Sequence, residues 1–199
     1  MCARERPVPG VSEREFICWF GNSITVDEGG TPVLLYHGST DPWFVPYLRY
    51  GMGPHFGNWE TARKRIEQRA FDYPDRDEHV PKNGDSIIPA YLRIERPAFM
   101  RDVHFDELKE FVSGILESEA LSRADIEAVC GNQNNWYALP DQEDTQTMAR
   151  IVQLLIERGY DGIAYRNVIE GNGTLSWVPF TLGQIWIVPV DLSYGENPR

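Results

Sequence analysis

A compact strand-like run of apolar residues lies in the first quarter of the chain. Val33 to Tyr36 form a compact apolar stretch, entered through Pro32 and closed by Gly38. An uninterrupted apolar run of this length, bounded by Pro and Gly, is typical of a short buried strand that ends in a tight turn. An aromatic and proline-rich loop follows, so we expect the strand end to be the start of an irregular surface segment.

Helical spacing appears in three later segments. Asn58 is a suitable N-cap for a helix through Ala62 and Ile66. Residues 72–86 are polar and contain Pro and Gly, which predicts an exposed loop. Two further helices are predicted by their apolar faces, and Ser122 is suited to cap the second of them. Those faces are Leu108, Phe111, Val112, Ile115 and Leu116, then Ile126 and Val129.

The last part of the chain predicts one amphipathic helix and then strands. The helix carries Met148, Ile151, Val152 and Leu155 after a polar connection, and Gly159 is placed to end it. Strand patterns follow over 162–166, 175–180 and 184–188, and an earlier one covers the segment IIPAYLRIERP. Helices and strands do not alternate strictly, so the order favours an α+β fold with a mixed or antiparallel sheet.

Composition and charge narrow the functional classes. The 199 residues include 42% hydrophobic and 25% charged positions, close to the averages of globular proteins, so the chain is expected to fold. The net charge of −11 argues against general binding to nucleic acid, because such proteins present cations to phosphates. Cys2, Cys18 and Cys130 show no disulfide or zinc spacing. No signal peptide or membrane-spanning run is evident, which predicts a cytoplasmic protein or one delivered by another route.

Three segments, in this order, resemble the ADP-ribosyltransferase superfamily of the diphtheria-toxin and poly(ADP-ribose)-polymerase type, especially its small bacterial and phage members. They are YHGST at 36–40, GPHFGNWETARKR at 53–65, and GYDGIAYRNVIEG with SWVPFTLGQIWIV between 159 and 188. The resemblance implies one domain over 1–199 with a core at about 33–188 and a helical insertion at about 104–130. It also implies a split mixed or antiparallel β-sheet with peripheral helices.

The resemblance assigns NAD+ contacts to the first two segments. His37 would bind the adenine-side ribose, the backbone of Gly38 would pair with the nicotinamide carboxamide, and Ser39 or Thr40 would add a hydroxyl donor. His55 replaces the family's usual tyrosine, and with Phe56 it would lie near the nicotinamide ring. Further candidate contacts are Phe44 in the covering loop, Asn58 at a helix start, and Arg65 or Arg63 toward the pyrophosphate. A Gly38→Val substitution is expected to block the cofactor and leave the fold intact.

The catalytic carboxylate departs from the family pattern. Counting back from Gln184 places Ser176 where the polymerases carry a glutamate. Glu170 is the nearest acid in the right part of the chain, and Asp161 is a second candidate that also suits a turn between helix and strand. Without an acid at the ribose, the chain would bind NAD+ and not turn it over. Asn58 is equally well explained as a helix cap and Glu170 as a loop glutamate.

The resemblance implies a mono-ADP-ribosyltransferase that uses NAD+ to modify a macromolecule, with a protein as the expected target and Glu170, His55 and His37 as catalytic residues. No metal is expected, because His37, His55, His79 and His104 lack metal-ligand spacing. A Cys18 or Cys130 nucleophile has no local support. One alternative is a catalytically silent NAD- or ADP-ribose-binding module. Another is a ligand-free interaction domain whose partner face is the acidic surface and the helical insertion at 104–130. A toxin or effector and a phage factor are both compatible with this prediction.

Overall fold

The computed structural model describes residues 12–39, 46–49, 51–72, 86–105, 107–130 and 141–188. Within these residues the protein is α+β, with two three-stranded sheets and the helices α1 to α5. The described residues divide into two compact units. Unit 1 draws on Met1–Val45, Phe56–Glu95 and Gly183–Arg199, and unit 2 on Pro46–His55 and Arg96–Leu182. The α+β class predicted from the sequence is confirmed.

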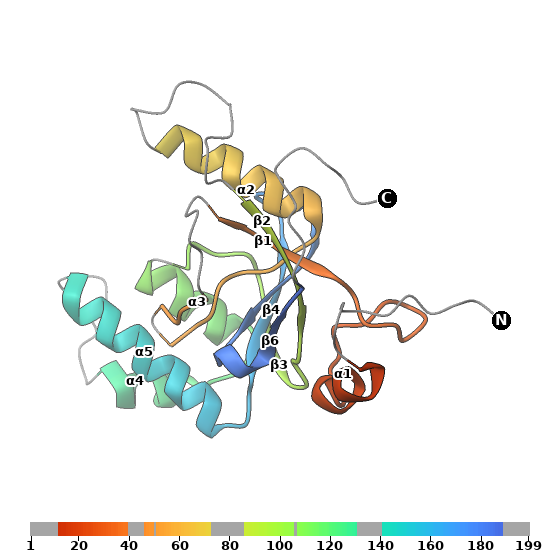
Figure 1. Cartoon of the computed structure of the whole chain (residues 1–199). Helices are drawn as coiled ribbons and strands as arrows, with labels where there is room; N and C mark the ends of the chain where they lie inside the picture. Colours follow the sequence, from red (N-terminus) through yellow and green to blue (C-terminus); the bar gives the residue numbers. More distant parts are fainter. Residues whose placement is uncertain are drawn as a thin grey trace. The chain divides into compact units, whose positions relative to one another are not determined.

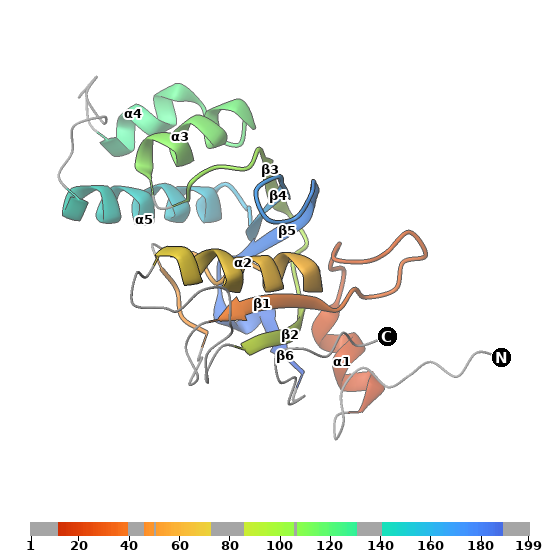
Figure 2. The same ribbon diagram turned by 90° about the horizontal axis from the view of Figure 1, so that it is seen from above.

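Unit 1 is built on an antiparallel sheet with the order β1-β2-β6. Its strands are β1 (Leu35–Ser39), β2 (Ser86–Leu92) and β6 (Ile185–Ile187). Helix α2 (Trp59–Asp72) lies along β1, as Figure 2 shows. A small buried cluster of Ala62, Ile66 and Ile87 lies between helix and sheet. Ala62 and Ile66 are four residues apart, so they share one face of α2.

The sequence patterns did not predict helix α1 (Glu13–Phe20), nor the strand at Pro97–Met100. The start of α1 is fixed by a capping box, in which Ser12 and Glu15 satisfy each other's backbone N–H groups. Phe16 and Phe20 are buried, and Phe16 makes edge-to-face contact with Trp186 of β6 at a centroid distance of 5.8 Å. Aromatic burial therefore holds α1 on the sheet of unit 1.

Unit 2 contains a mixed sheet with the order β3-β4-β5. Strand β3 (Pro97–Met100) runs parallel to β4 (Gly162–Asn167), and β4 pairs antiparallel with β5 (Thr174–Pro179). The β4–β5 register pairs Ile163 with Val178 and Tyr165 with Ser176, so these side chains share one face of the sheet.

Three helices lie together beside this sheet, as Figures 1 and 2 show. They are α3 (Leu108–Glu117), α4 (Arg123–Cys130) and α5 (Asp141–Glu157). The apolar faces predicted for α3 and α5 are buried in one core with Ile163, Tyr165 and Val178 of the sheet. Gly159, with a φ of +83°, ends α5 as predicted, because a left-handed residue there is favourable for glycine.

The boundaries predicted from the sequence need three corrections. The first strand includes Gly38 instead of turning at it. Helix α5 begins at Asp141, inside the segment expected to be a connection. The loop predicted at 72–86 falls largely on residues 73–85, which lie outside the described part of the chain, as does Pro189. The prediction of one domain over 1–199 stays a prediction. Among the described residues, no helix has both the length and the apolar character needed to cross a membrane.

Candidate functional site

The predicted site residues are divided between the two units. His37, Gly38, Ser39, Phe56, Asn58 and Arg65 belong to unit 1, and His55 and Glu170 belong to unit 2. Thr40 and Phe44 lie outside the described residues. The candidate residues of each unit are therefore described separately.

In unit 1 the alternation of β1 separates His37 from α2. Tyr36 and Gly38 face the helix, because Tyr36 packs on the Ala62 cluster and Gly38 adjoins Ala62 itself. Successive side chains of a strand point to opposite faces, so His37 lies on the other face. There its ring is 5.7 Å from that of Phe56, which is fully buried. Of the predicted residues of unit 1, His37 and Phe56 are thus brought together.

The packing of unit 1 leaves no room for a side chain at Gly38. A Cβ atom at this position would lie 2.2 Å from the carbonyl oxygen of Ala62 and 3.1 Å from Ile66 Cγ1. Helix α2 therefore approaches β1 as closely as a glycine permits. The expectation that Gly38→Val would leave the fold intact is wrong, because the valine side chain would collide with the backbone of α2.

The backbone polar groups of Gly38 lie on the edge of β1 that does not pair with β2. Tyr36 donates its N–H to the carbonyl oxygen of Gly57 at 2.8 Å and accepts the Gly57 N–H at 3.0 Å. Tyr36 and Pro89 lie opposite each other in the β1–β2 pair but are not hydrogen-bonded to each other, because Tyr36 uses its backbone groups on Gly57. In an antiparallel pair every second residue of a strand is oriented alike, so Gly38 has the same orientation as Tyr36. The N–H and C=O of Gly38 consequently point away from β2, to the edge of β1 on which Gly57 pairs.

Asn58 is the N-cap of α2, as the sequence suggested. Its Oδ1 atom accepts the N–H and the hydroxyl of Thr61, both at 2.8 Å. The oxygen is thus engaged by the helix itself. Arg63 is bound by Glu60 and by Glu67 on neighbouring turns, which disfavours it as the pyrophosphate ligand. Arg65 lies half-buried on the same helix, and its proposed anion contact stays a prediction.

In unit 2 His55 sits among aromatic side chains. Its Nδ1 atom is 2.9 Å from the hydroxyl oxygen of Tyr165, and its ring meets Phe105 edge-on at a centroid distance of 4.6 Å. Tyr165 is only 3% exposed, so this hydrogen bond is shielded from water. The imidazole is therefore held in a fixed orientation by one polar and one aromatic neighbour.

Glu170 occupies the loop between β4 and β5. Asn167 Nδ2 donates to the Glu170 carboxylate at 2.8 Å, and Asn167 Oδ1 accepts the Glu170 N–H at 2.8 Å. Asn167 is itself 1% exposed at the end of β4. Glu170 is half-buried and hydrogen-bonded to Asn167 at the end of β4, in contrast to a fully solvated loop glutamate.

Ser176, the residue that the resemblance places where a glutamate was expected, lies on the core-facing side of β5. It is 1% exposed, and its Oγ atom has no hydrogen-bond partner among the described residues. An orphaned hydroxyl of this kind is costly, so it requires an explanation. Asp161, the other acid considered, accepts the N–H of Arg96 at 2.9 Å and donates its own N–H to the Arg96 carbonyl. Asp161 thus joins β3 to β4, in keeping with its reading as a connecting residue.

The weaker chemical candidates gain no support from the described residues. Cys18 and Cys130 are free thiols, and burial raises the pKa of Cys130, which reduces its thiolate fraction at neutral pH. No group of three or more His, Cys, Asp or Glu side chains in the described ranges is arranged to hold a metal ion. His79 lies outside those ranges.

Comparison of the chain with protein-family models, with curated proteins and with solved structures gives no match. The structure also adds residues that sequence reasoning missed. Tyr165 and Phe105 surround His55, and Asp102 binds the loop that carries Glu170. Tyr165 and Asn167 stand two apart on a strand that ends near Glu170, which is a signal the sequence contained. Asp102 is 66 residues from its partner and carried no such signal.

Proposed function

We propose that the chain is a mono-ADP-ribosyltransferase that transfers ADP-ribose from NAD+ to a protein. The bond between the ribose C1′ atom and the nicotinamide nitrogen would break, and a bond from C1′ to the acceptor side chain would form. Nicotinamide leaves as a neutral molecule, and the acceptor releases one proton. The transition state carries positive charge at C1′, so a nearby carboxylate would stabilise it.

The observation that carries this proposal is the backbone of Gly38. A carboxamide is recognised by one donor and one acceptor in fixed geometry, and the Gly38 N–H and C=O supply that pair at the edge of β1 that faces away from β2. His37, on the face of β1 opposite α2, supports a ribose contact. The resemblance of YHGST to the family's first motif assigns the same roles to these two residues.

In unit 2 the proposal rests on Glu170. Asp161, the other acid considered, is hydrogen-bonded to the backbone of Arg96. Ser176 is a serine and carries no charge. Glu170 is half-buried, and Asn167 orients its carboxylate. An oriented carboxylate stabilises a developing cation better than a freely rotating one, because no reorganisation is needed during the reaction. His55, fixed by Tyr165, would serve recognition of the nicotinamide ring.

A second candidate function is an NAD- or ADP-ribose-binding module without turnover. One observation favours it: Ser176, at the family's glutamate position, is a buried side chain of the core face. If Glu170 cannot replace that acid, the chain would bind the dinucleotide and leave it intact. The two candidates differ in a single measurable property, the release of nicotinamide.

The deciding experiment measures NAD+ binding by calorimetry and nicotinamide release by chromatography. The parent chain is expected to do both, and a lysate incubated with labelled NAD+ should yield a labelled protein. Glu170→Gln should bind NAD+ within a few-fold of the parent and release nicotinamide about a hundredfold more slowly. Glu127→Gln, an exposed acid on α4, is the matched control and should behave as the parent. Binding without release by the parent would instead support the binding module.

A further inference from the structure

Two side-chain oxygen atoms accept four consecutive backbone N–H groups in the loop that carries Glu170. Asp102 Oδ2 accepts those of Val168 and Ile169 at 2.8 and 3.2 Å. Asn167 Oδ1 accepts those of Glu170 and Gly171 at 2.8 and 3.0 Å. The loop is thus held from both sides, by Asp102 after β3 and by Asn167 at the end of β4.

Polar contacts, and not apolar burial, give this loop its shape. The side chains of Val168 and Ile169 are 68% and 51% exposed, so they add little to its stability. Asn172 and Gly173 have φ values of 50° and 81°, which turn the chain back toward β5. Removing the two oxygen acceptors should therefore loosen the loop locally and leave the core of unit 2 folded.

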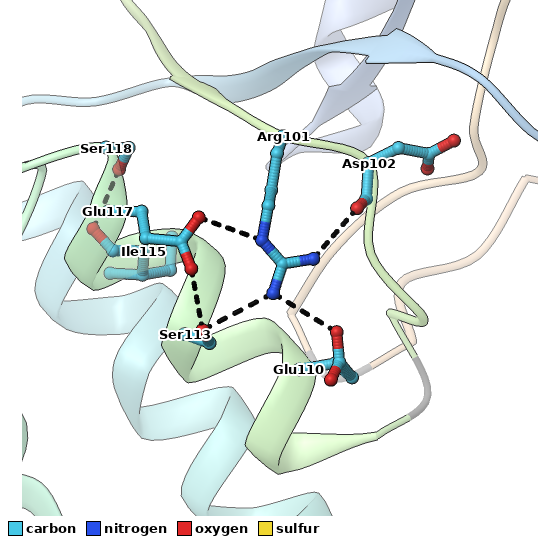
Figure 3. A network of polar contacts seen from close by, with 7 residues as sticks. All are labelled: Arg101, Asp102, Glu110, Ser113, Ile115, Glu117 and Ser118. Atoms are coloured by element: carbon cyan, nitrogen blue, oxygen red, sulfur yellow. Dashed lines mark hydrogen bonds and ion pairs between the residues drawn. The ribbon is translucent and has the colours of Figure 1, made fainter.

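Asp102 is itself held in place by the network in Figure 3. Arg101 Nη1 donates to the Asp102 carbonyl oxygen at 3.2 Å, and the same guanidinium binds Glu110 and Glu117 of α3 at 3.2 and 2.9 Å. The carboxylate of Asp102 points away from Arg101 in that view, which leaves it to the loop amides. A chain of contacts thus runs from α3 through Arg101 and Asp102 to the loop.

We propose that Asn167 and Asp102 are positioning residues that fix the carboxylate of Glu170 for its reaction. Asn167 acts directly, because its Nδ2 atom binds the carboxylate. Asp102 acts through the backbone by holding Val168 and Ile169, the residues that lead to Glu170. This inference rests on the proposed transferase function. Displacing an oriented catalytic group by about 1 Å can lower a rate about a hundredfold without a comparable loss of substrate binding.

The first part of the test measures amide hydrogen exchange by NMR and needs no activity. Asp102→Ala should speed exchange at Val168 and Ile169 by roughly five- to tenfold, the scale of one lost hydrogen bond. The amides of β4 should keep their protection. Asp102→Asn retains an oxygen acceptor and should restore slow exchange. Unchanged exchange at Val168 and Ile169 in Asp102→Ala would overturn the role of Asp102.

The second part measures kcat and KM for nicotinamide release. Asp102→Ala should lower kcat about tenfold or more with KM for NAD+ nearly unchanged, and Asp102→Asn should recover most of the rate. Asn167→Asp keeps an acceptor for the two amides but loses the Nδ2 donor and sets a second carboxylate beside Glu170. It should keep slow exchange at Glu170 and Gly171 and still lose kcat.

A matched control comes from unit 1. Asp27 Oδ1 accepts the N–H groups of Gly29 and Thr31 at 2.8 and 2.9 Å, which is the same kind of loop contact. Asp27→Ala should speed amide exchange there and leave kcat at the parental value. If Asp102→Ala loosens its loop and keeps parental kcat, positioning is overturned while the transferase function stands. If the parent releases no nicotinamide, the proposed function and the positioning role fail together, and the exchange data still report the loop contacts.

Discussion

Tyr165 on β4 and Ser176 on β5 lie directly opposite each other, and they differ in how their hydroxyl groups are satisfied. The Tyr165 hydroxyl is 2.9 Å from His55 Nδ1, whereas the buried Ser176 Oγ atom has no hydrogen-bond partner in the part of the chain that the structure describes. A desolvated hydroxyl without a hydrogen bond weakens the folded state by about 1–3 kcal/mol. At this pair of opposite residues, the hydroxyl of Tyr165 therefore stabilises the folded state and that of Ser176 destabilises it.

Ser176→Ala is expected to stabilise the protein by about 1 kcal/mol, because it removes the orphaned hydroxyl and leaves the Cβ atom in place. Chemical denaturation followed by circular dichroism measures the change. Ser23→Ala is the matched control, since the buried Ser23 Oγ donates to the Leu92 carbonyl at 2.8 Å and accepts the Ile94 N–H at 3.0 Å. That variant should lose about 1–3 kcal/mol. A comparable loss in Ser176→Ala would show that its hydroxyl is satisfied in solution.

Gly38→Ala is expected to destabilise the packing of α2 on β1, in the range of about 1–3 kcal/mol or more that overpacking costs. The reason is the 2.2 Å approach between the added Cβ atom and the Ala62 carbonyl oxygen. Gly183→Ala is the control, because no atom of the described ranges lies within 4 Å of a Cβ atom added there. Thermal unfolding should show a lower Tm for the first variant and little change for the second. Equal Tm values would mean that α2 shifts away without cost.

The elements that the sequence predicted are those whose signals are local. Asn58 begins α2 and Gly159 ends α5, because caps act on the nearest turn of their own helix. Helix α1 has a capping box formed by Ser12 and Glu15, but it has only 8 residues, and so short a helix has no long apolar stripe that would predict it. Gly38 was misjudged as a turn because the atom that requires a glycine, the Ala62 carbonyl oxygen, comes from a different element.

The candidate site shows the same division. Glu170 could be predicted as a candidate from the sequence, because it lies three residues after Asn167, its hydrogen-bond partner. The surroundings of His55 could not be predicted from the sequence, because Tyr165 is 110 residues away along the chain. The contact from Asp102 to Val168 spans 66 residues and depends on the parallel pairing of β3 with β4. Such long-range contacts arise from the register of the sheet, which the periodicity of a single chain does not encode.

His55 and Tyr165 are expected to be energetically coupled. Tyr165→Phe removes the hydroxyl at 2.9 Å from His55 Nδ1 and keeps the ring that packs near Phe105. A double-mutant cycle with His55→Ala should give a coupling energy of about 0.5–1.5 kcal/mol, the net value of one shielded hydrogen bond. Urea unfolding of the four proteins measures it. A coupling near zero would indicate that the ring contacts alone hold His55.

The carboxyl group of Asp125 is expected to titrate below the ordinary range of aspartate. The hydroxyl of Ser122 donates to Asp125 Oδ2 at 2.7 Å and its backbone N–H donates at 2.9 Å, and these two bonds, followed by the nearby Arg158, lower the pKa of Asp125. The Asp125 N–H in turn donates to Ser122 Oγ at 3.2 Å, which completes a capping box at the start of α4. Ser122 is therefore the first residue to change in a test.

A carboxyl whose pKa is lower in the folded state stabilises that state at pH values above its unfolded pKa, and the contribution disappears as pH falls through the folded pKa. The first turn of α4 should accordingly loosen only in acid, below the range where free aspartate titrates. NMR titration of the Asp125 carboxyl carbon measures the pKa, and Ser122→Ala should move it back toward the ordinary value because the largest cause is removed. Ser122→Thr keeps the hydroxyl and should retain the low pKa. An identical titration in the parent and Ser122→Ala would assign the shift to Arg158 instead, and Arg158→Gln should then raise the pKa of Asp125.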